Sequence, residues 1–382
     1  IRDQPRSRGL GDVYKRQKMN SIFIKKYFLP GFIFQSLIIG GGYGTGRELV
    51  EFFLTAGPIA GLMNMAVATI IWSFVLAICF ELARSGHNYE YRSFIRSLLG
   101  KAWTIYEVLY LIGVVVVVSV MGSASGEIIH DIFGIPNIIG IVIMMVLVGL
   151  IVFYGSSLIE KLFSLWSVIL YSVFVIMFIV VFSRYSDTIG MSFYKQSSDT
   201  SWIVGGIKYA AYNIGLAPAI LFCVRHIETR KEAIISGLIA GAIGMVPAFL
   251  MFLSLLSQYP KVLDASVPVN IILNELGWDS LKFIFQIVLF GTFIETGVGL
   301  IHGFNERIAA VYPQLTNIFR SAIGIGLLII SIFVANAVGL VGLIAKGYGT
   351  LTWGYLIVFV IPVVTIGLWR ILYGTGWKFQ AE

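Results

Sequence analysis

Charged side chains are scarce in this chain of 382 residues. Asp, Glu, Lys and Arg make up 12% of the sequence, against 58% hydrophobic residues. The mean hydropathy of +0.88 lies far above the range of soluble proteins. Because apolar runs recur along the whole chain, a single secretory signal does not account for this composition. The scarcity of charge excludes a soluble domain and predicts a multi-pass membrane protein.

Cysteine and histidine are also rare. The chain has two cysteines, Cys79 and Cys223, and four scattered histidines, with no spacing typical of a metal site or a disulfide framework. No motif pairs a nucleophile with a base. We therefore expect free thiols, no enzyme activity, no metal centre and no cofactor beyond Na⁺ or H⁺ as a coupling ion. The net charge of +7 lies in short loops, where membrane topology explains it better than nucleic-acid binding.

Glycine, by contrast, is concentrated in one stretch, IGGGYGTGRELVEFF, from Ile39 to Phe53. Glycine weakens a helix because its backbone has the most freedom to lose. The run from Gly40 to Gly46 should therefore be unwound within an otherwise apolar span. Non-helical backbone at membrane depth is tolerated only where it is buried in protein or lines a cavity. The stretch predicts a transporter whose substrate site lies at this break.

The length suits one all-α bundle of ten transmembrane helices, at about 20 residues per span plus loops. We expect a non-native or disordered segment at 1–18, because its DVYKRQ sequence resembles a translated sequencing adaptor. The remaining boundaries are a first repeat with helices 1–5, an extracellular linker, a second repeat with helices 6–10 and a cytoplasmic tail. They fall at 19–183, 184–201, 202–373 and 374–382.

The distribution of Lys and Arg gives the orientation. One alternating set of loops carries 15 of these residues and the opposite set carries 5. By the positive-inside rule both termini are cytoplasmic and the number of spans is even. We expect a multi-pass protein of the cell (inner or plasma) membrane. The count is least secure in 321–373, where Gly339–Gly349 is interpreted as a short separate segment.

A second interruption, AYNIGLAP, lies in the sixth span from Ala211 to Pro218. The two broken helices, one and six, lie five spans apart, as do the unusually long helices three and eight. An odd number of spans per half makes the halves point oppositely across the membrane. This pattern is typical of inverted-repeat transporters, in which paired interrupted helices indicate the binding site.

The two breaks should bring two helix N-termini together near the membrane centre. Their unsatisfied N–H groups suit a carboxylate, and the carbonyl ends of the other half-helices suit an ammonium group or Na⁺. Such a site fits a zwitterion, hence a small amino acid. Core packing is the alternative for Tyr212. The predicted substrate-binding residues are Gly40, Gly41, Gly42, Tyr43, Gly44, Thr45, Gly46, Tyr212, Asn213 and Gly215.

Ion coupling needs a titratable or oxygen-rich group at membrane depth. Helix eight carries a polar and small face of Thr292, Glu295, Gly299 and His302, and Thr292 and Glu295 lie roughly 16–21 Å into the span at about 1.5 Å per residue. Thr292 or Thr296 would assist the coupling. Intramembrane acids are usually functional, so Glu295 is a candidate proton relay or cation ligand; a neutral acid bonded to a neighbouring helix is the alternative. Glu48, just after the first break, is a second candidate. Arg47 is better interpreted as an ion pair with Glu51 than as a carboxylate clamp.

The segments GGGYGTGRELVEFF, KYAAYNIG and LIAKGYGTL resemble the YkvI-type amino-acid permeases of the amino acid–polyamine–organocation (APC) superfamily. The resemblance covers about residues 19–378. It implies a leucine-transporter-like 5+5 inverted repeat, with the site between helices one, three, six and eight. It also implies that Thr292 and Thr296 fall near the cation site of sodium-coupled relatives. The chain departs from those relatives by lacking an adjacent Ser/Thr pair there.

The resulting expectation is a secondary active transporter that moves a small amino acid, or a related amine or carboxylate solute, by alternating access. Its partners would be that solute and the lipid bilayer, with no nucleic acid. Two alternatives remain open: a nutrient sensor that binds ligand without net transport, and a passive channel. The sequence leaves substrate identity, transport direction, coupling ion and oligomeric state open.

Overall fold

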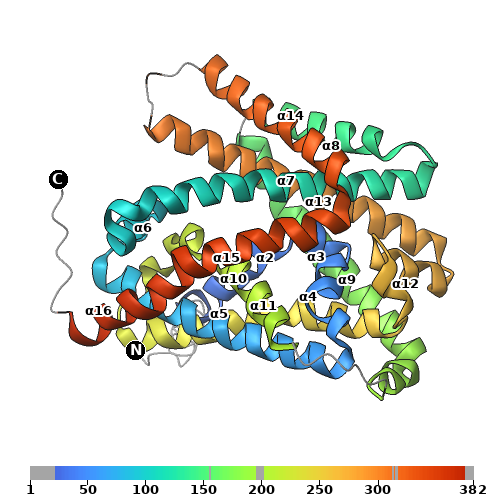
Figure 1. Ribbon diagram of the computed structural model, residues 1–382, viewed down its shortest axis with the longest axis horizontal. Helices are drawn as coiled ribbons and strands as arrows, with labels where there is room; N and C mark the ends of the chain where they lie inside the picture. The colour runs from blue at the N-terminus through green and yellow to red at the C-terminus, as the bar shows by residue number, and fades with distance from the viewer. Residues whose placement is uncertain (1–21, 155, 195–201, 312–313, 315–316, 375–382) are drawn as a thin grey trace, which may run out of the picture.

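The computed structural model describes residues 22–154, 156–194, 202–311, 314 and 317–374. The proposed foreign segment at 1–18, residues 195–201 of the expected linker, and 375–382 of the expected tail lie outside this range. The described part of the chain is helical and contains no strand (Figure 1). The all-α prediction is therefore confirmed for these residues.

Six described helical stretches are long and apolar enough to cross a membrane, or seven if one bent pair counts as a span. Two shorter apolar helices, Leu29–Ile38 and Asn137–Phe153, accompany them. This composition and length agree with a multi-pass membrane protein. The ten-helix, five-plus-five arrangement stays a prediction.

The helices pack side by side in one bundle, with α8 and α14 along one side, α5 and α11 along the other, and the broken helices between them (Figure 1). The principal helices are α2 (Leu29–Ile38), α3 (Gly41–Gly44), α4 (Arg47–Phe52), α5 (Pro58–Gly86), α6 (Tyr91–Leu99), α7 (Trp103–Phe133), α8 (Asn137–Tyr154), α9 (Ser156–Ser192), α10 (Trp202–Ile214), η3 (Ala217–His226), α11 (Arg230–Leu256), α12 (Pro268–Leu276), α13 (Asp279–Val311), α14 (Asn317–Gly342), α15 (Gly349–Tyr355) and α16 (Leu368–Tyr373).

The first break is present but is not fully unwound. Ile39 and Gly40 are extended, Gly41–Gly44 forms one helical turn, and Gly46 adopts the left-handed conformation at φ 79°. The expectation of an unwound Gly40–Gly46 is therefore wrong for the central turn. In this turn the amides of Gly44 and Thr45 donate to the carbonyls of Gly40 and Gly41. Pairing them costs less free energy in a buried setting than leaving them without acceptors.

The second break separates α10 from η3, and the two segments meet at an angle of 64°. Gly215 and Leu216 lie between them. Pro218 lies at the start of η3, where the missing N–H costs little. The second half is a 3₁₀ helix rather than an α-helix.

Two other expectations needed correction. The α9 helix continues to Ser192, so the linker predicted from 184 is helical up to that point; only Tyr185 departs from helical geometry. Gly339–Gly349 is no separate segment, because the chain kinks at Gly339 (φ 74°) and then continues as a helix. Between α11 and α13 the chain also forms the short helix α12, which begins at Pro268.

Glycines on α11 allow three helices to approach closely. A Cβ atom on Gly237 or Gly241 would lie 2.3 Å or 2.4 Å from backbone nitrogens of α5, and one on Gly244 would lie 2.9 Å from the ring of Phe34 in α2. At the same end, the Lys26 amino group donates to Glu232 of α11 across 3.0 Å. The helices α2, α5 and α11 therefore form one tightly packed group.

Candidate functional site

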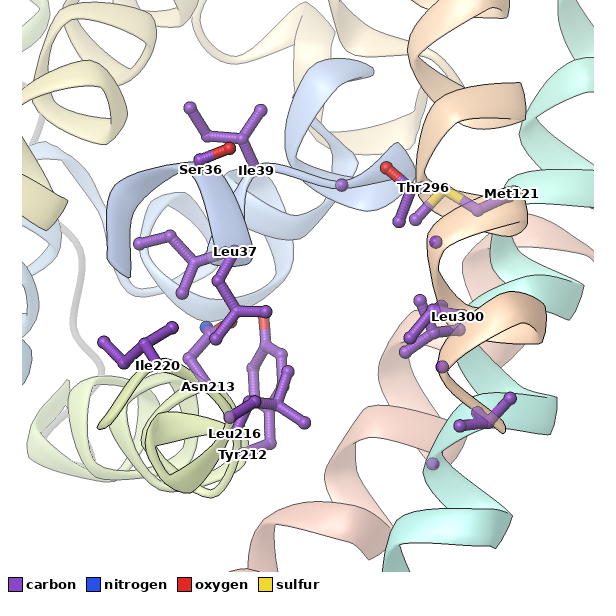
Figure 2. A pocket seen from close by; sticks show the side chains of 18 of the residues that line it. Ser36, Leu37, Ile39, Met121, Tyr212, Asn213, Leu216, Ile220, Thr296 and Leu300 are labelled. Atoms are coloured by element: carbon purple, nitrogen blue, oxygen red, sulfur yellow. The ribbon is translucent and has the colours of Figure 1, made fainter. Parts of the chain in front are cut away.

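A cavity of about 580 Å³ lies between the broken helices on one side and α7 and α13 on the other (Figure 2). This volume is in the range of small-molecule sites. Ser36 and Leu37 line it from α2, Tyr212 and Asn213 from α10, and Thr296 from α13. Three of the lining residues, Ser36, Phe222 and Gly299, are exposed, so the cavity communicates with the outside of the protein.

Glu48 is the acidic group at the junction of the two breaks. It lies on α4, directly after the first break, is 2% exposed, and lines the cavity. Its Oε1 accepts a hydrogen bond from the hydroxyl of Tyr212, on the last turn of α10. None of the ion pairs found among the described residues involves Glu48. A buried carboxylate in this setting needs a proton or a cation.

Aromatic rings surround this carboxyl group. The ring of Tyr212 stacks on Tyr348 at a centroid distance of 4.8 Å and meets Tyr209 edge-on at 5.8 Å. Gly42 approaches from the other side: a Cβ atom there would lie 2.7 Å from Glu48 Oε2. The absence of a side chain at Gly42 thus makes room for the carboxyl group against the first break.

One face of α13 completes the cavity wall. Thr292, Glu295 and Thr296 line the cavity, and Gly299 and Gly303 continue the same face. The hydroxyl of Thr292 donates to its own helix at Val288, across 2.8 Å, and lies 3.3 Å from the indole nitrogen of Trp166. Thr292 is therefore hydrogen-bonded within the protein, whereas Glu295 is only partly buried and lies near Tyr171.

The structure brings some of the predicted site residues together and separates others. All four coupling candidates, Glu48, Thr292, Glu295 and Thr296, line the cavity, as do three of the substrate candidates, Gly40, Tyr212 and Asn213. The remaining substrate candidates are buried and do not line it. These are Gly41, Gly42, Tyr43, Gly44, Thr45, Gly46 and Gly215. The assignment of all these residues to a working site stays a prediction.

Internal contacts occupy the first break. The amide of Gly41 donates to the sulfur of Met121 on α7, at 2.9 Å. The hydroxyl of Thr45 donates to Gly42, and its carbonyl accepts from Val269 at the start of α12. The helix that follows Gly46 is six residues long, so its dipole is weaker than the sequence led us to expect. The N-terminus of the short α4 helix thus stabilises a bound carboxylate less than predicted.

Polar side chains close the end of the bundle opposite the cavity, which we call the sealed end. It is formed by Arg47 with 263–265 and by Asp131 with α12 and α13. Arg47 donates to the carbonyls of Leu263 (2.6 Å) and Ala265 (3.1 Å) and pairs with Glu51 at 3.0 Å. The favoured ion pair is therefore present. Asp131 pairs with Lys282 at 2.8 Å and accepts from two side-chain amides, Asn270 and Gln286, at 3.2 Å and 2.6 Å.

Sequence reasoning missed several residues at the opposite, open end, which we define by Tyr110, Phe222, Arg307 and Tyr355. All four line the cavity. Arg307 was counted only as a loop charge that sets topology, because a basic residue near a helix terminus carries that signal regardless of any other role. The periodicity of α13 was the available clue, since Gly299, Gly303 and Arg307 extend the polar face by steps of four residues.

Comparison with known proteins gives one sequence relative and a structural neighbour. No protein-family model matches the chain. A Bacillus subtilis (strain 168) protein described as "Uncharacterized membrane protein YkvI" is 24% identical over 322 residues, which are 79% of this chain and 89% of that protein. A manganese transporter of Eremococcus coleocola, crystallised with an aromatic bis-isothiourea compound, superposes with a TM-score of 0.62 at 14% identity, over 95% of this chain and 83% of the other.

At 14% identity the second likeness is one of fold. The chain is thus a helical, multi-pass membrane protein with the fold of a solved transporter. The Bacillus relative is described only as a membrane protein, so membership of an amino-acid permease family stays a proposal. Among the described residues, no group of three or more His, Cys, Asp or Glu side chains is placed to hold a metal ion.

Proposed function

We propose that the protein is a secondary active transporter that moves a small amino acid, or a related amine or carboxylate solute, by alternating access coupled to H⁺ or Na⁺. The proposal includes a ten-helix, five-plus-five inverted repeat of the APC type. Both termini are cytoplasmic in the cell membrane. The coarse fold supports it, with a broken first helix and one bent helix pair facing a cavity.

The observation that carries the proposal is the placement of Glu48. Its carboxyl group lies in the cavity, belongs to the first broken helix, and is hydrogen-bonded to Tyr212 of the second. A proton, a cation or the ammonium group of a solute binds at this carboxyl group. Its binding changes the charge at the contact between the two broken helices. The coupling of ion and solute thus acts on the contact that joins the broken helices.

The asymmetry of the bundle supports alternating access. With both termini in the cytoplasm, the open end of the cavity faces the cytoplasm and the sealed end faces outward. In this state a solute could leave toward the cytoplasm while Arg47 and Asp131 hold the outer end shut. The other state requires these contacts to break.

In the sensor alternative, the same site binds a ligand but the protein does not transport it. It is distinguished by flux, because a sensor binds its ligand but does not exchange it across a bilayer. A passive channel is a weaker alternative, since Tyr43, Phe53 and Leu54 are fully buried around the outer part of the first helix. A channel would give fast flux that does not saturate and is not stimulated by exchange.

The test begins with a thermal-shift screen of the purified protein against amino acids, amines and carboxylates, with and without Na⁺ and across pH. A stabilising compound is then used in proteoliposome counterflow and in uptake driven by a pH or Na⁺ gradient. We expect saturable counterflow in the wild type. Binding without flux would favour the sensor and overturn the transporter.

Replacement of Glu48 gives the sharpest result. Glu48→Gln keeps the size and the hydrogen bond from Tyr212 but removes the titratable group. We expect gradient-driven accumulation to fall to the passive level, a loss of about tenfold or more, while counterflow persists in part. Glu295→Gln tests the second acid in the cavity, and Glu275→Gln, which removes a surface acid paired with Lys261, serves as the control. Wild-type accumulation in Glu48→Gln would exclude Glu48 as the coupling group.

A further inference from the structure

Arg307 is the cationic side chain among the residues that line the cavity. The two acidic lining residues, Glu48 and Glu295, lie deeper. Arg307 follows Glu295 by twelve positions on α13, which corresponds to about 18 Å along the helix axis at 1.5 Å per residue. Its charge therefore belongs to the open end of the cavity and not to the junction of the broken helices.

Aromatic rings hold the Arg307 guanidinium in place. Its central carbon lies 3.5 Å from the ring centroid of Tyr110 and 3.9 Å from that of Tyr91. Ring faces attract a guanidinium group and fix its plane, but they accept none of its N–H groups in the ordinary way. The side chain is thus oriented while its donors stay available.

The nearby carboxylate does not use these donors fully. Glu107 Oε1 lies 3.7 Å from Arg307 Nη1, beyond hydrogen-bond distance, and Glu107 Oε2 accepts from the Tyr91 hydroxyl at 2.7 Å. Arg307 Nη1 is buried and has no hydrogen-bond partner in the described part of the chain. A buried charged donor without an acceptor is costly, which favours the arrival of one.

A second polar group at this end lacks a partner too. The Tyr355 side chain is 2% exposed and lines the cavity, and its hydroxyl makes no hydrogen bond among the described residues. Gly113 of α7 leaves space beside it, since a Cβ atom there would lie 3.2 Å from the hydroxyl oxygen. Two unsatisfied donors, Arg307 and Tyr355, therefore line the same end of one cavity.

We propose that Arg307, with Tyr355, forms an anion subsite at the open end of the cavity that binds the carboxylate group of the transported solute. The subsite rests on the proposed function, because it takes the solute as it enters or leaves the deeper site. The planar fork of the guanidinium matches a carboxylate in two-point geometry, and the oriented rings keep it ready for that contact. The substrate class is thereby narrowed to solutes with a carboxylate.

The experiment measures thermal stabilisation of the purified full-length protein by sodium acetate, L-alanine, ethylamine hydrochloride and potassium phosphate at equal ionic strength. Acetate and L-alanine should stabilise the wild type through Arg307, whereas any stabilisation by ethylamine, which offers only an ammonium group, should be unchanged in Arg307→Gln. Arg307→Gln should weaken the half-saturating concentration of both carboxylates by about tenfold or more, the scale of a lost charge-assisted hydrogen bond. Arg307→Lys keeps the charge but loses the forked guanidinium. Its half-saturating carboxylate concentration should lie between those of the wild type and Arg307→Gln.

Two further variants separate a binding role from a structural one. Glu107→Gln removes the competing negative charge and should tighten carboxylate binding. Arg96→Gln is the matched control, since Arg96 also packs on a ring, that of Trp103 at 4.3 Å, but does not line the cavity. Its carboxylate binding should equal that of the wild type.

The results have distinct meanings. No stabilisation of the wild type by either carboxylate, an equal effect of phosphate, or unchanged binding in Arg307→Gln would each overturn the subsite. L-Alanine counterflow that persists in Arg307→Gln with unchanged half-saturation would overturn it while the transporter proposal stands. Carboxylate binding that depends on Arg307, with no solute exchanged in proteoliposomes, would keep the subsite and sink the transporter.

Discussion

The two ends of the bundle use arginine in opposite ways. At the sealed end, Arg47 is buried and donates to two loop carbonyls and a carboxylate. At the open end, Arg307 lies between tyrosine rings, and its nearest carboxylate is beyond hydrogen-bond distance. The α12 helix of the sealed end and the α6 helix, whose Tyr91 ring packs on Arg307, lie at opposite sides of the molecule in Figure 1.

The difference shows how one residue type can serve closure or recognition. An arginine whose donors meet protein acceptors fixes the segments that supply them. An arginine held by ring faces, whose carboxylate partner lies beyond hydrogen-bond distance, is fixed in place but keeps donors for another molecule. If this comparison is right, mutations at the two ends should affect different quantities, stability at one end and binding at the other.

The largest expected effect on stability is at Arg47. Arg47→Gln leaves the carbonyls of Leu263 and Ala265 and the carboxylate of Glu51 without their donor. Because Arg47 is buried but Glu51 is partly exposed, this loss should cost about 2–3 kcal/mol. Arg307→Gln, by contrast, should cost about 1 kcal/mol or less, since its ion pair is long and partly exposed. Reversible unfolding in mixed detergent micelles measures both. Equal losses would break the comparison.

Gly46 should give the next largest effect. Its φ of 79° lies in the left-handed region, where a side chain costs about 1–2 kcal/mol. Gly134 has a similar φ of 69° at the end of α7, with open space around it, and is the matched control. Both substitutions to Ala should lower the free energy of unfolding, Gly46→Ala by somewhat more, because its Cβ atom would also lie 3.3 Å from the Leu255 side chain. Only Gly46→Ala should also slow counterflow, because Gly46 joins the two short segments of the first broken helix.

The Asp131–Lys282 pair should give the smallest effect. Both side chains are partly exposed, so the coupling energy in a double-mutant cycle of Asp131→Asn and Lys282→Met should be about 0.5–1 kcal/mol. Loss of the pair should nevertheless favour opening of the sealed end. A cysteine at Thr45, which is fully buried and hydrogen-bonded to Val269, should then react faster with an impermeant maleimide in Asp131→Asn. An unchanged rate would show that Asp131 does not hold this end closed.

Much of the fold could be predicted from local sequence. Apolar runs gave the helices, and the glycine and proline clusters gave both breaks. These signals are strong because they act on the backbone of the residues that carry them. The helical turn at Gly41–Gly44 was missed for a related reason: propensity describes an isolated helix, and buried surroundings override it.

The rest depends on contacts between distant segments. Asp131 and Lys282 stand far apart in sequence, and only the fold brings them together at 2.8 Å. The Glu48–Tyr212 hydrogen bond likewise joins the two broken helices, although each residue was selected separately. Arg307 was missed because its charge already had an explanation in membrane topology. Residues with two roles are the hardest to recognise from sequence alone.

The glycines along α11 limit which parts of the protein can move separately. Because α5 and α2 contact α11 at distances that leave no space for even a methyl group, sliding one helix past another would cause steric clashes. The Lys26–Glu232 pair adds a link between the beginnings of two of these helices. Any motion that tilts α2 must therefore move α5 and α11 with it, about a hinge that lies outside these three helices.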